Sequence, residues 1–157
     1  MTTYSIAEVL EMALQTERLG YQFYTAMAEK FKQDTGLLKL FNTLAAKEKV
    51  HERIFGDLQE KVSRSKPEPV QWEEVSDYMR AFVESQFFLG KGKSLPSMEG
   101  IKTVKDAVDF AMGFEKETLL YFVGLRAVVG EKGPVDEVIK EEQSHITWLQ
   151  RFKQELK

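Results

Sequence analysis

Four segments of the chain repeat apolar residues at alternating spacings of three and four positions, which is the period of one face of an α-helix. Three of them cover approximately residues 5–32, 35–62 and 104–129, and the fourth begins near Pro134. The same spacing is typical of helices that pack against one another at shallow angles. No segment shows the alternation of a strand, so the pattern predicts an all-α protein.

The breaks between these segments predict how the helices are connected. Ser5 and Glu8 form a capping box at the first helix, and Pro134 suits the first turn of the fourth. The short breaks QDTG and GEKG indicate antiparallel neighbours. About forty residues separate the second helix from the third, which indicates a crossover along the bundle. We expect a single domain, residues 1–157, in which this crossover contains an extra short helix over 73–88.

Each apolar stripe is interrupted near its middle by ionisable residues. Positions three apart lie on the same face of a helix, so a bundle would bring all of the interruptions to one level. The two halves of the chain also echo each other, because residues 13–24 align with residues 111–122. The interruptions are Glu17 on the first stripe, Glu48 and His51 on the second, Glu115 on the third, and Glu142 and His145 on the fourth.

Four carboxylates buried in a bundle require compensating positive charge, because an unpaired buried ion costs several kcal/mol. The stripes carry no Lys or Arg at this level, whereas two divalent cations would balance the charge. Carboxylate oxygen and imidazole nitrogen suit iron, manganese or zinc better than copper(I). Two ions about 3.5–4 Å apart, bridged by carboxylates, would fit such a site. The alternative is a polar core layer without metal.

The composition narrows the remaining classes of function. The absence of cysteine excludes disulfides, thiolate metal sites, iron–sulfur clusters and a cysteine nucleophile, and it fits a reducing compartment. The net charge of −3 gives no reason to expect a nucleic acid or an anionic membrane as partner. The longest apolar run, residues 119–125, is too short for a membrane span, and the start of the sequence lacks a signal-peptide pattern. We expect a cytoplasmic protein.

The Glu-x-x-His pairs on the second and fourth helices, with one Glu on each of the others, resemble the ligand set of the ferritin-like di-iron carboxylate superfamily. The spacing of seven residues from Glu17 to Tyr24 resembles the pattern of the rubrerythrin-like branch in particular. The resemblance implies a ferritin-like four-helix bundle that holds two iron ions, with manganese or zinc as alternatives. It implies that Tyr24 hydrogen-bonds a ligand carboxylate. It also implies ligand roles: Glu48 and Glu142 bridging, Glu17 and Glu115 terminal, and His51 and His145 one to each metal.

By the same resemblance, the protein would reduce hydrogen peroxide or dioxygen and would form a homodimer. Rubrerythrins also have a rubredoxin-like domain with four cysteines, so in this cysteine-free sequence the electrons are expected from an external electron-transfer protein. Rubrerythrins also carry an extra carboxylate one turn from the third-helix ligand. Redox-linked movement of the iron is attributed to this carboxylate. Here the positions three residues either side of Glu115 are Met112 and Thr118.

Three other functions stay open at this point. They are a ferroxidase for iron storage or delivery, a structural zinc or manganese bundle without redox activity, and a hydroxylase or oxygenase. The residues around the ligands also have alternatives. Glu52, Glu117 and Glu141 are expected to be solvated, although one of them could orient a ligand histidine. Thr118 faces inward, where dioxygen or water could bind, and the alternative is that it bonds its own helix backbone. Tyr121 is expected to fill the core.

Overall fold

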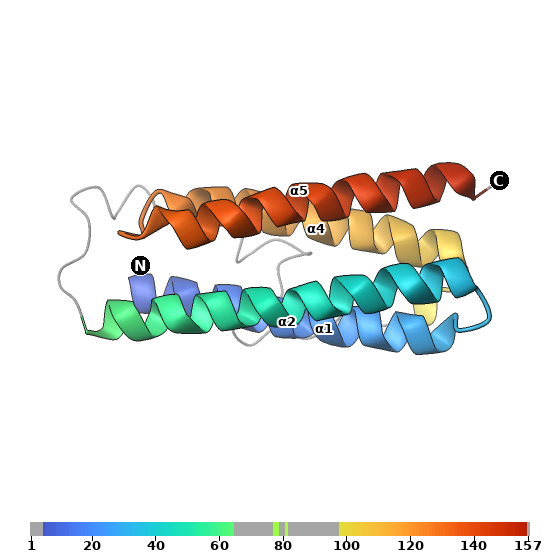
Figure 1. Ribbon diagram of the computed structural model, residues 1–157, viewed down its shortest axis with the longest axis horizontal. Coiled ribbons are helices and arrows are strands. Elements are labelled where there is room, and N and C mark those ends of the chain that lie inside the picture. The colour runs from blue at the N-terminus through green and yellow to red at the C-terminus, as the bar shows by residue number, and fades with distance from the viewer. Residues whose placement is uncertain (1–4, 65–76, 79–80, 82–97, 157) are drawn as a thin grey trace.

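The structure is a computed structural model that describes residues 5–64, 77–78, 81 and 98–156. The helices run along the long axis of the molecule, with the α1–α2 hairpin beside the α4–α5 hairpin (Figure 1). The described residues contain no strand, which confirms the predicted all-α bundle. The helices are α1 (Ile6–Lys30), α2 (Thr35–Ser63), the short 3-10 helix η1 (Met98–Gly100), α4 (Val104–Arg126) and α5 (Lys132–Glu155).

Side-chain caps explain where the helices begin. At α1 the Ser5 hydroxyl accepts the Glu8 N–H and the Glu8 carboxylate accepts the Ser5 N–H, which is the predicted capping box. Thr103 and Asp106 form the same box at α4. Helix α5 begins two residues before Pro134. A proline is tolerated there because the first N–H groups of a helix have no intrahelical partner.

The predicted extra helix over residues 73–88 lies outside the described residues except at positions 77, 78 and 81, where the backbone is helical. None of the described helices is long and apolar enough to cross a membrane.

The core consists of two apolar clusters that lie toward opposite ends of the bundle. In α1, the buried apolar residues between positions 9 and 14 belong to one cluster and those between positions 23 and 28 belong to the other, so that Glu17 lies between the clusters. In α4 the same two clusters lie on either side of Glu115. Each large apolar side chain buried in this way contributes roughly 1.5–3 kcal/mol. The clusters therefore stabilise the bundle and enclose a polar layer at its middle.

Candidate metal centre

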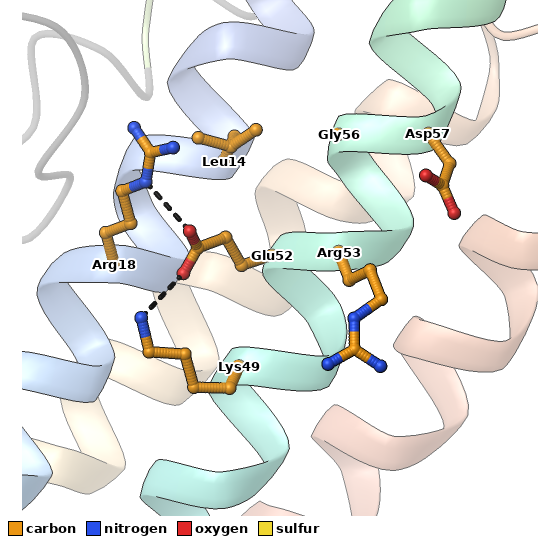
Figure 2. Close-up of a pocket in the computed structure, with 7 residues that line it drawn as sticks. All are labelled: Leu14, Arg18, Lys49, Glu52, Arg53, Gly56 and Asp57. Carbon is orange, nitrogen blue, oxygen red and sulfur yellow. Dashed lines mark hydrogen bonds and ion pairs between the residues drawn. The ribbon is translucent and has the colours of Figure 1, made fainter.

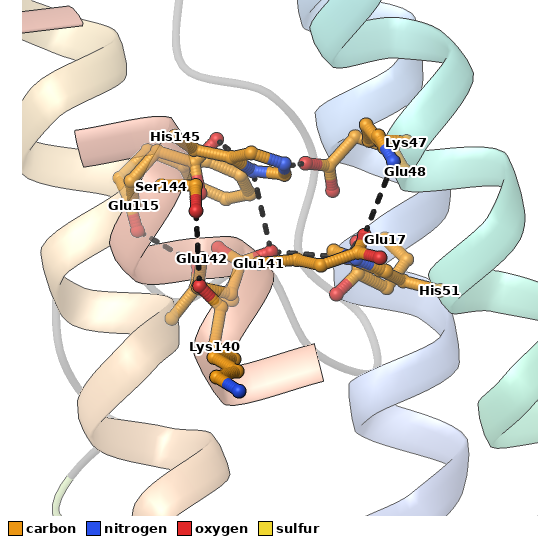
Figure 3. Close-up of polar contacts among 12 residues, drawn as sticks. Glu17, Lys47, Glu48, His51, Glu115, Lys140, Glu141, Glu142, Ser144 and His145 are labelled. Atoms are coloured by element: carbon orange, nitrogen blue, oxygen red, sulfur yellow. Dashed lines mark hydrogen bonds and ion pairs between the residues drawn. The ribbon is translucent and has the colours of Figure 1, made fainter. Parts of the chain in front are cut away.

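The structure brings all six predicted ligands together in this polar layer. They come from all four long helices, and none is more than 1% exposed to solvent. Their side chains point toward one another between the two hairpins (Figure 3). The positions confirm the prediction that the helical stripes place their ionisable residues at one level. Whether each side chain binds a metal ion stays a prediction.

The six side chains form two overlapping groups of four. The His51 set consists of Glu17, Glu48, His51 and Glu142, and the His145 set consists of Glu48, Glu115, Glu142 and His145. Within each set, one nitrogen or oxygen per residue lies within 4.8 Å of the others. Because both sets contain Glu48 and Glu142, one carboxylate from each hairpin is available to both. This is the arrangement that two adjacent, carboxylate-bridged ions require.

Both imidazoles turn the same ring nitrogen toward the carboxylates. Nδ1 of His51 lies 3.0 Å from a Glu142 oxygen and 3.6 Å from a Glu17 oxygen. Nδ1 of His145 lies 3.5 Å from an oxygen of Glu115 and 3.5 Å from an oxygen of Glu142. The two rings are nearly parallel, with their centroids 5.5 Å apart. Each histidine is thus aimed at the carboxylates of its own set.

The hydrogen-bonding capacity of the cluster is largely unused. Of the ten buried side-chain nitrogen and oxygen atoms without a hydrogen bond in the described part of the chain, nine belong to these six residues. A buried polar atom that stays unpaired costs roughly 1–3 kcal/mol. Among the described residues, no Lys or Arg forms an ion pair with the four carboxylates, whose ion-pair partners are the two histidines. Oxygen and imidazole donors in this number fit two divalent first-row metal ions.

Three of the carboxyl groups hold protons readily when no metal balances their charge. Burial raises the pKa of Glu17 to about 8, and the charge of Glu115 adds to the effect. Burial and the charge of Glu17 raise the pKa of Glu48 well above its ordinary value. Burial and the charge of Glu115 do the same for the pKa of Glu142. Metal ions would therefore compete with protons for these oxygens.

The pKa values of Glu115 and His51 shift in the direction that favours the charged form of each side chain. Burial alone would raise the pKa of Glu115, but its interactions with Glu142, His145 and Tyr24 lower that pKa to about 2. Burial alone would lower the pKa of His51, but the carboxylates around it raise that pKa to about 9. In the metal-free protein at neutral pH, an imidazolium and carboxyl protons thus supply part of the positive charge that metal ions would bring.

One hydroxyl group near the site bonds a predicted ligand, and two others bond backbone carbonyls. Tyr24 donates a hydrogen bond to Oε1 of Glu115, as predicted for a residue that supports a ligand carboxylate. Tyr121 donates to the Val9 carbonyl at 2.7 Å, and Thr118 donates to the Phe114 carbonyl of its own helix at 2.7 Å. The backbone alternative for Thr118 therefore describes the structure.

Two residues next to the predicted ligands contribute more to the site than the sequence pattern alone indicates. Glu141 was expected to be solvated, with the alternative that it orients a ligand histidine, and the alternative describes the structure, because a Glu141 carboxylate oxygen lies 2.9 Å from Nε2 of His51. Gly20 makes room for a ligand, because a Cβ atom there would lie 2.8 Å from Oε2 of Glu48. A glycine inside a helical pattern signals close packing in general, but the sequence does not show which side chain uses the space.

A surface pocket of about 380 Å³ lies on the outer face of the α1–α2 hairpin (Figure 2). None of the six ligand candidates lines it, because their side chains point into the bundle instead. Within the pocket, Glu52 forms ion pairs with Arg18 at 2.9 Å and with Lys49 at 3.2 Å. Exposed pairs of this kind contribute little to stability. Glu52 is thus engaged at the surface and does not orient His51.

The fold and the cluster define a ferritin-like four-helix bundle with a carboxylate–histidine site that fits two metal ions. A model of the rubrerythrin family matches residues 8–88, just over half of the chain, and the chain belongs to this family. This confirms the predicted family.

A solved structure supports the same fold. The chain resembles a Thermotoga maritima protein proposed to be a ferritin-like diiron-carboxylate protein, with 22% identity and a TM-score of 0.72. The match covers 100% of this chain and 99% of the other, and at this identity it shows the fold alone. No curated protein matches the sequence.

Proposed function

We propose that the chain is a non-haem di-iron redox protein that reduces hydrogen peroxide or dioxygen with electrons from an external donor. The observation that carries the proposal is the pair of four-residue sets that share Glu48 and Glu142. A purely structural ion would need only one such set, whereas shared carboxylates couple two ions. When bound, two iron ions would supply the two electrons that convert one peroxide to water or one dioxygen to peroxide.

The protein residues would hold, neutralise and shield the metal pair. The four carboxylates balance the charge of two divalent cations, with Glu17 and Glu115 each available to only one set. The two histidines add one neutral nitrogen to each set. The apolar clusters on either side exclude water, which strengthens the electrostatic interactions in the layer.

One side of the site lacks a group found in the rubrerythrins described above. Met112 and Thr118, which stand one turn from Glu115, are both buried, and neither offers a carboxylate. The Thr118 hydroxyl is occupied by its helix backbone. We therefore propose a cycle in which the ligand set stays the same in both oxidation states.

The test is to load the metal-free protein with ferrous iron under anaerobic conditions and then add peroxide or dioxygen. We expect about two irons per chain, and oxidation with the near-ultraviolet band of an oxo-bridged ferric pair. Glu142→Ala should lose the iron and the band, whereas Glu137→Ala, an exposed position on the same helix, should keep both.

Two results would overturn the proposal. Zinc or manganese that iron does not replace would indicate a structural bundle. Bound ferrous iron that neither oxidant changes would exclude redox chemistry. Sizing of the same sample tests the expected homodimer, and a closed cage of many subunits would instead favour iron storage.

A further inference from the structure

The two histidines differ in what lies behind them. Nε2 of His51, the nitrogen that faces away from the ligand cluster, lies 2.9 Å from Oε2 of Glu141. Nε2 of His145 is buried and has no hydrogen-bond partner among the described residues. The His145 ring instead lies against Trp148, with the ring centroids 5.5 Å apart. The same ligand type is thus supported by a carboxylate in one set only.

A carboxylate behind a histidine fixes both the proton and the direction of the ring. An ionised carboxylate only accepts hydrogen bonds, so Nε2 of His51 must carry the proton. When the ring loses its second proton to bind a metal ion, the lone pair therefore lies on Nδ1, the atom that faces Glu17 and Glu142. Such a partner also makes the ligand nitrogen more basic. Glu141 therefore prepares His51 to bind a cation.

The position of Glu141 links the two halves of the bundle. It lies on α5 next to Glu142, whereas His51 lies on α2, so the contact crosses from one hairpin to the other (Figure 3). Nζ of Lys47, one turn before His51, lies 3.7 Å from the same Glu141 oxygen. The Glu141 side chain is 29% exposed, so this ion pair orients the carboxylate more than it stabilises the fold.

The asymmetry is present in the sequence itself. When the two Glu-x-x-His motifs are superimposed, Glu141 precedes Glu142 and Lys47 precedes Glu48. A lysine has no acceptor atom, so the position that supports His51 from α5 has no equivalent on α2 for His145. The Tyr24 hydroxyl acts in the same direction, because its hydrogen bond to Glu115 draws electron density from a ligand of the His145 set.

We propose that Glu141 is a positioning residue that makes the His51 set the tighter of the two metal sites. The inference rests on the proposed two-metal function and adds an order of filling to it. Glu17, Glu48, His51 and Glu142 would hold the first ion, and the His145 set would then hold the second. Loss of an outer hydrogen-bond partner of this kind lowers metal affinity by roughly 10–100-fold.

The first experiment is an anaerobic titration of the metal-free protein with ferrous iron. We expect two binding steps of different affinity in the wild type. Glu141→Ala should weaken the tighter step by roughly 10–100-fold and bring the two steps together, and Glu141→Gln, which keeps a neutral acceptor, should lie between. Glu137→Gln is the matched control on the same helix, and it should leave both steps unchanged.

The second experiment reads the hydrogen bond directly in zinc-loaded protein, which is diamagnetic. Proton–nitrogen spectra should show a downfield Nε2–H resonance of His51, protected from exchange, that disappears or shifts strongly in Glu141→Ala and shifts partly in Glu141→Gln. A role limited to stabilising the helix would not move this resonance.

The outcomes separate the two proposals. A wild type that binds no pair of ions removes the proposed function and this inference with it. A wild type that binds two ions, with steps and Nε2–H resonance unchanged in the Glu141 variants, removes the inference alone. If Glu141→Ala does not fold, the Glu141→Gln titration and spectrum decide.

Discussion

The α1–α2 and α4–α5 hairpins supply the same set of side chains to the centre but surround them differently. Glu17 has both carboxylate oxygens without a hydrogen bond, whereas Glu115 accepts one from Tyr24. Burial raises the pKa of Glu17 to about 8, but the pKa of Glu115 falls to about 2 because Glu142, His145 and Tyr24 outweigh its burial. Equivalent ligands thus become inequivalent through their neighbours.

The internal echo shows where this difference arises. The alignment that places Glu17 over Glu115 places Tyr24 over Phe122, which has no hydroxyl group. Phe122 packs against Phe55 in an apolar cluster instead. The Tyr24 hydroxyl oxygen therefore distinguishes the surroundings of Glu115 from those of Glu17, just as Glu141 and Lys47 distinguish the surroundings of the two histidines.

The largest expected effect comes from removing a carboxylate that belongs to both four-residue sets. Glu142→Ala deletes a carboxylate that belongs to both sets, so both metal ions should be lost. Glu17→Ala affects only the His51 set and should leave one ion bound. Metal analysis after removal of loosely bound ions checks both variants. Two ions retained at full occupancy in Glu142→Ala would contradict its assignment as a shared ligand.

The metal-free protein should lose stability as the pH rises. The folded-state pKa of Glu17, about 8, exceeds its ordinary value of 4.5, and that of His51, about 9, exceeds 6.5. Between the ordinary pKa and the folded-state pKa of each group, the folded chain therefore binds more protons than the unfolded chain. Stability is full below the ordinary values and falls between about pH 5 and 9, by about 1.4 kcal/mol per pH unit for each extra proton.

Denaturant titrations at several pH values, with and without metal, measure this dependence. Bound cations replace the protons, so the metal-loaded protein should be more stable at pH 8 than the metal-free protein by a larger margin than at pH 5. A metal-free protein that is equally stable across this range would mean that the cluster does not hold these protons.

Much of the bundle was predictable because periodic stripes depend only on positions along each helix. The stripes alone place Glu48 and His51 at the level of Glu17, without information on contacts between helices. The support from Glu141 was not predictable in this way, because it depends on how α5 sits against α2. Local sequence cannot show such a contact when the residue also looks suited to solvent.

Gly20→Ala tests whether metal binding depends on the space around Glu48 as well as on the Glu48 carboxylate itself. The new Cβ would lie 2.8 Å from Oε2 of Glu48 and 3.1 Å from the Phe114 ring, so the carboxylate must move. Overpacking of this kind costs about 1–3 kcal/mol. We expect weaker metal binding in a protein that still folds, because alanine favours the helix by about 1 kcal/mol.

Gly56→Ala is the matched control on α2. Its Cβ would make ordinary contact with Leu14 at 3.6 Å, so the metal affinity should stay the same and the stability should rise slightly. Equal metal affinities in the two variants would show that Glu48 does not need its present position.

The smallest expected effect on metal binding comes from Tyr24→Phe, which makes the surroundings of Glu115 resemble those of Glu17. The variant removes a buried hydrogen bond to a carboxylate, worth roughly 1.5–3 kcal/mol, and keeps the ring in its apolar cluster. The pKa of Glu115 should rise, because this bond helps to lower it. The metal affinity of the His145 set should approach that of the His51 set.

Tyr121→Phe provides the comparison that makes this result specific. It loses a buried hydrogen bond to the Val9 carbonyl, away from the ligands, so the stability should fall without a change in either metal-binding step. If Tyr24→Phe behaves like Tyr121→Phe, the Tyr24 hydroxyl stabilises the bundle only. If the two binding steps converge in Tyr24→Phe alone, the hydroxyl is one of the groups that make the two halves of the centre different.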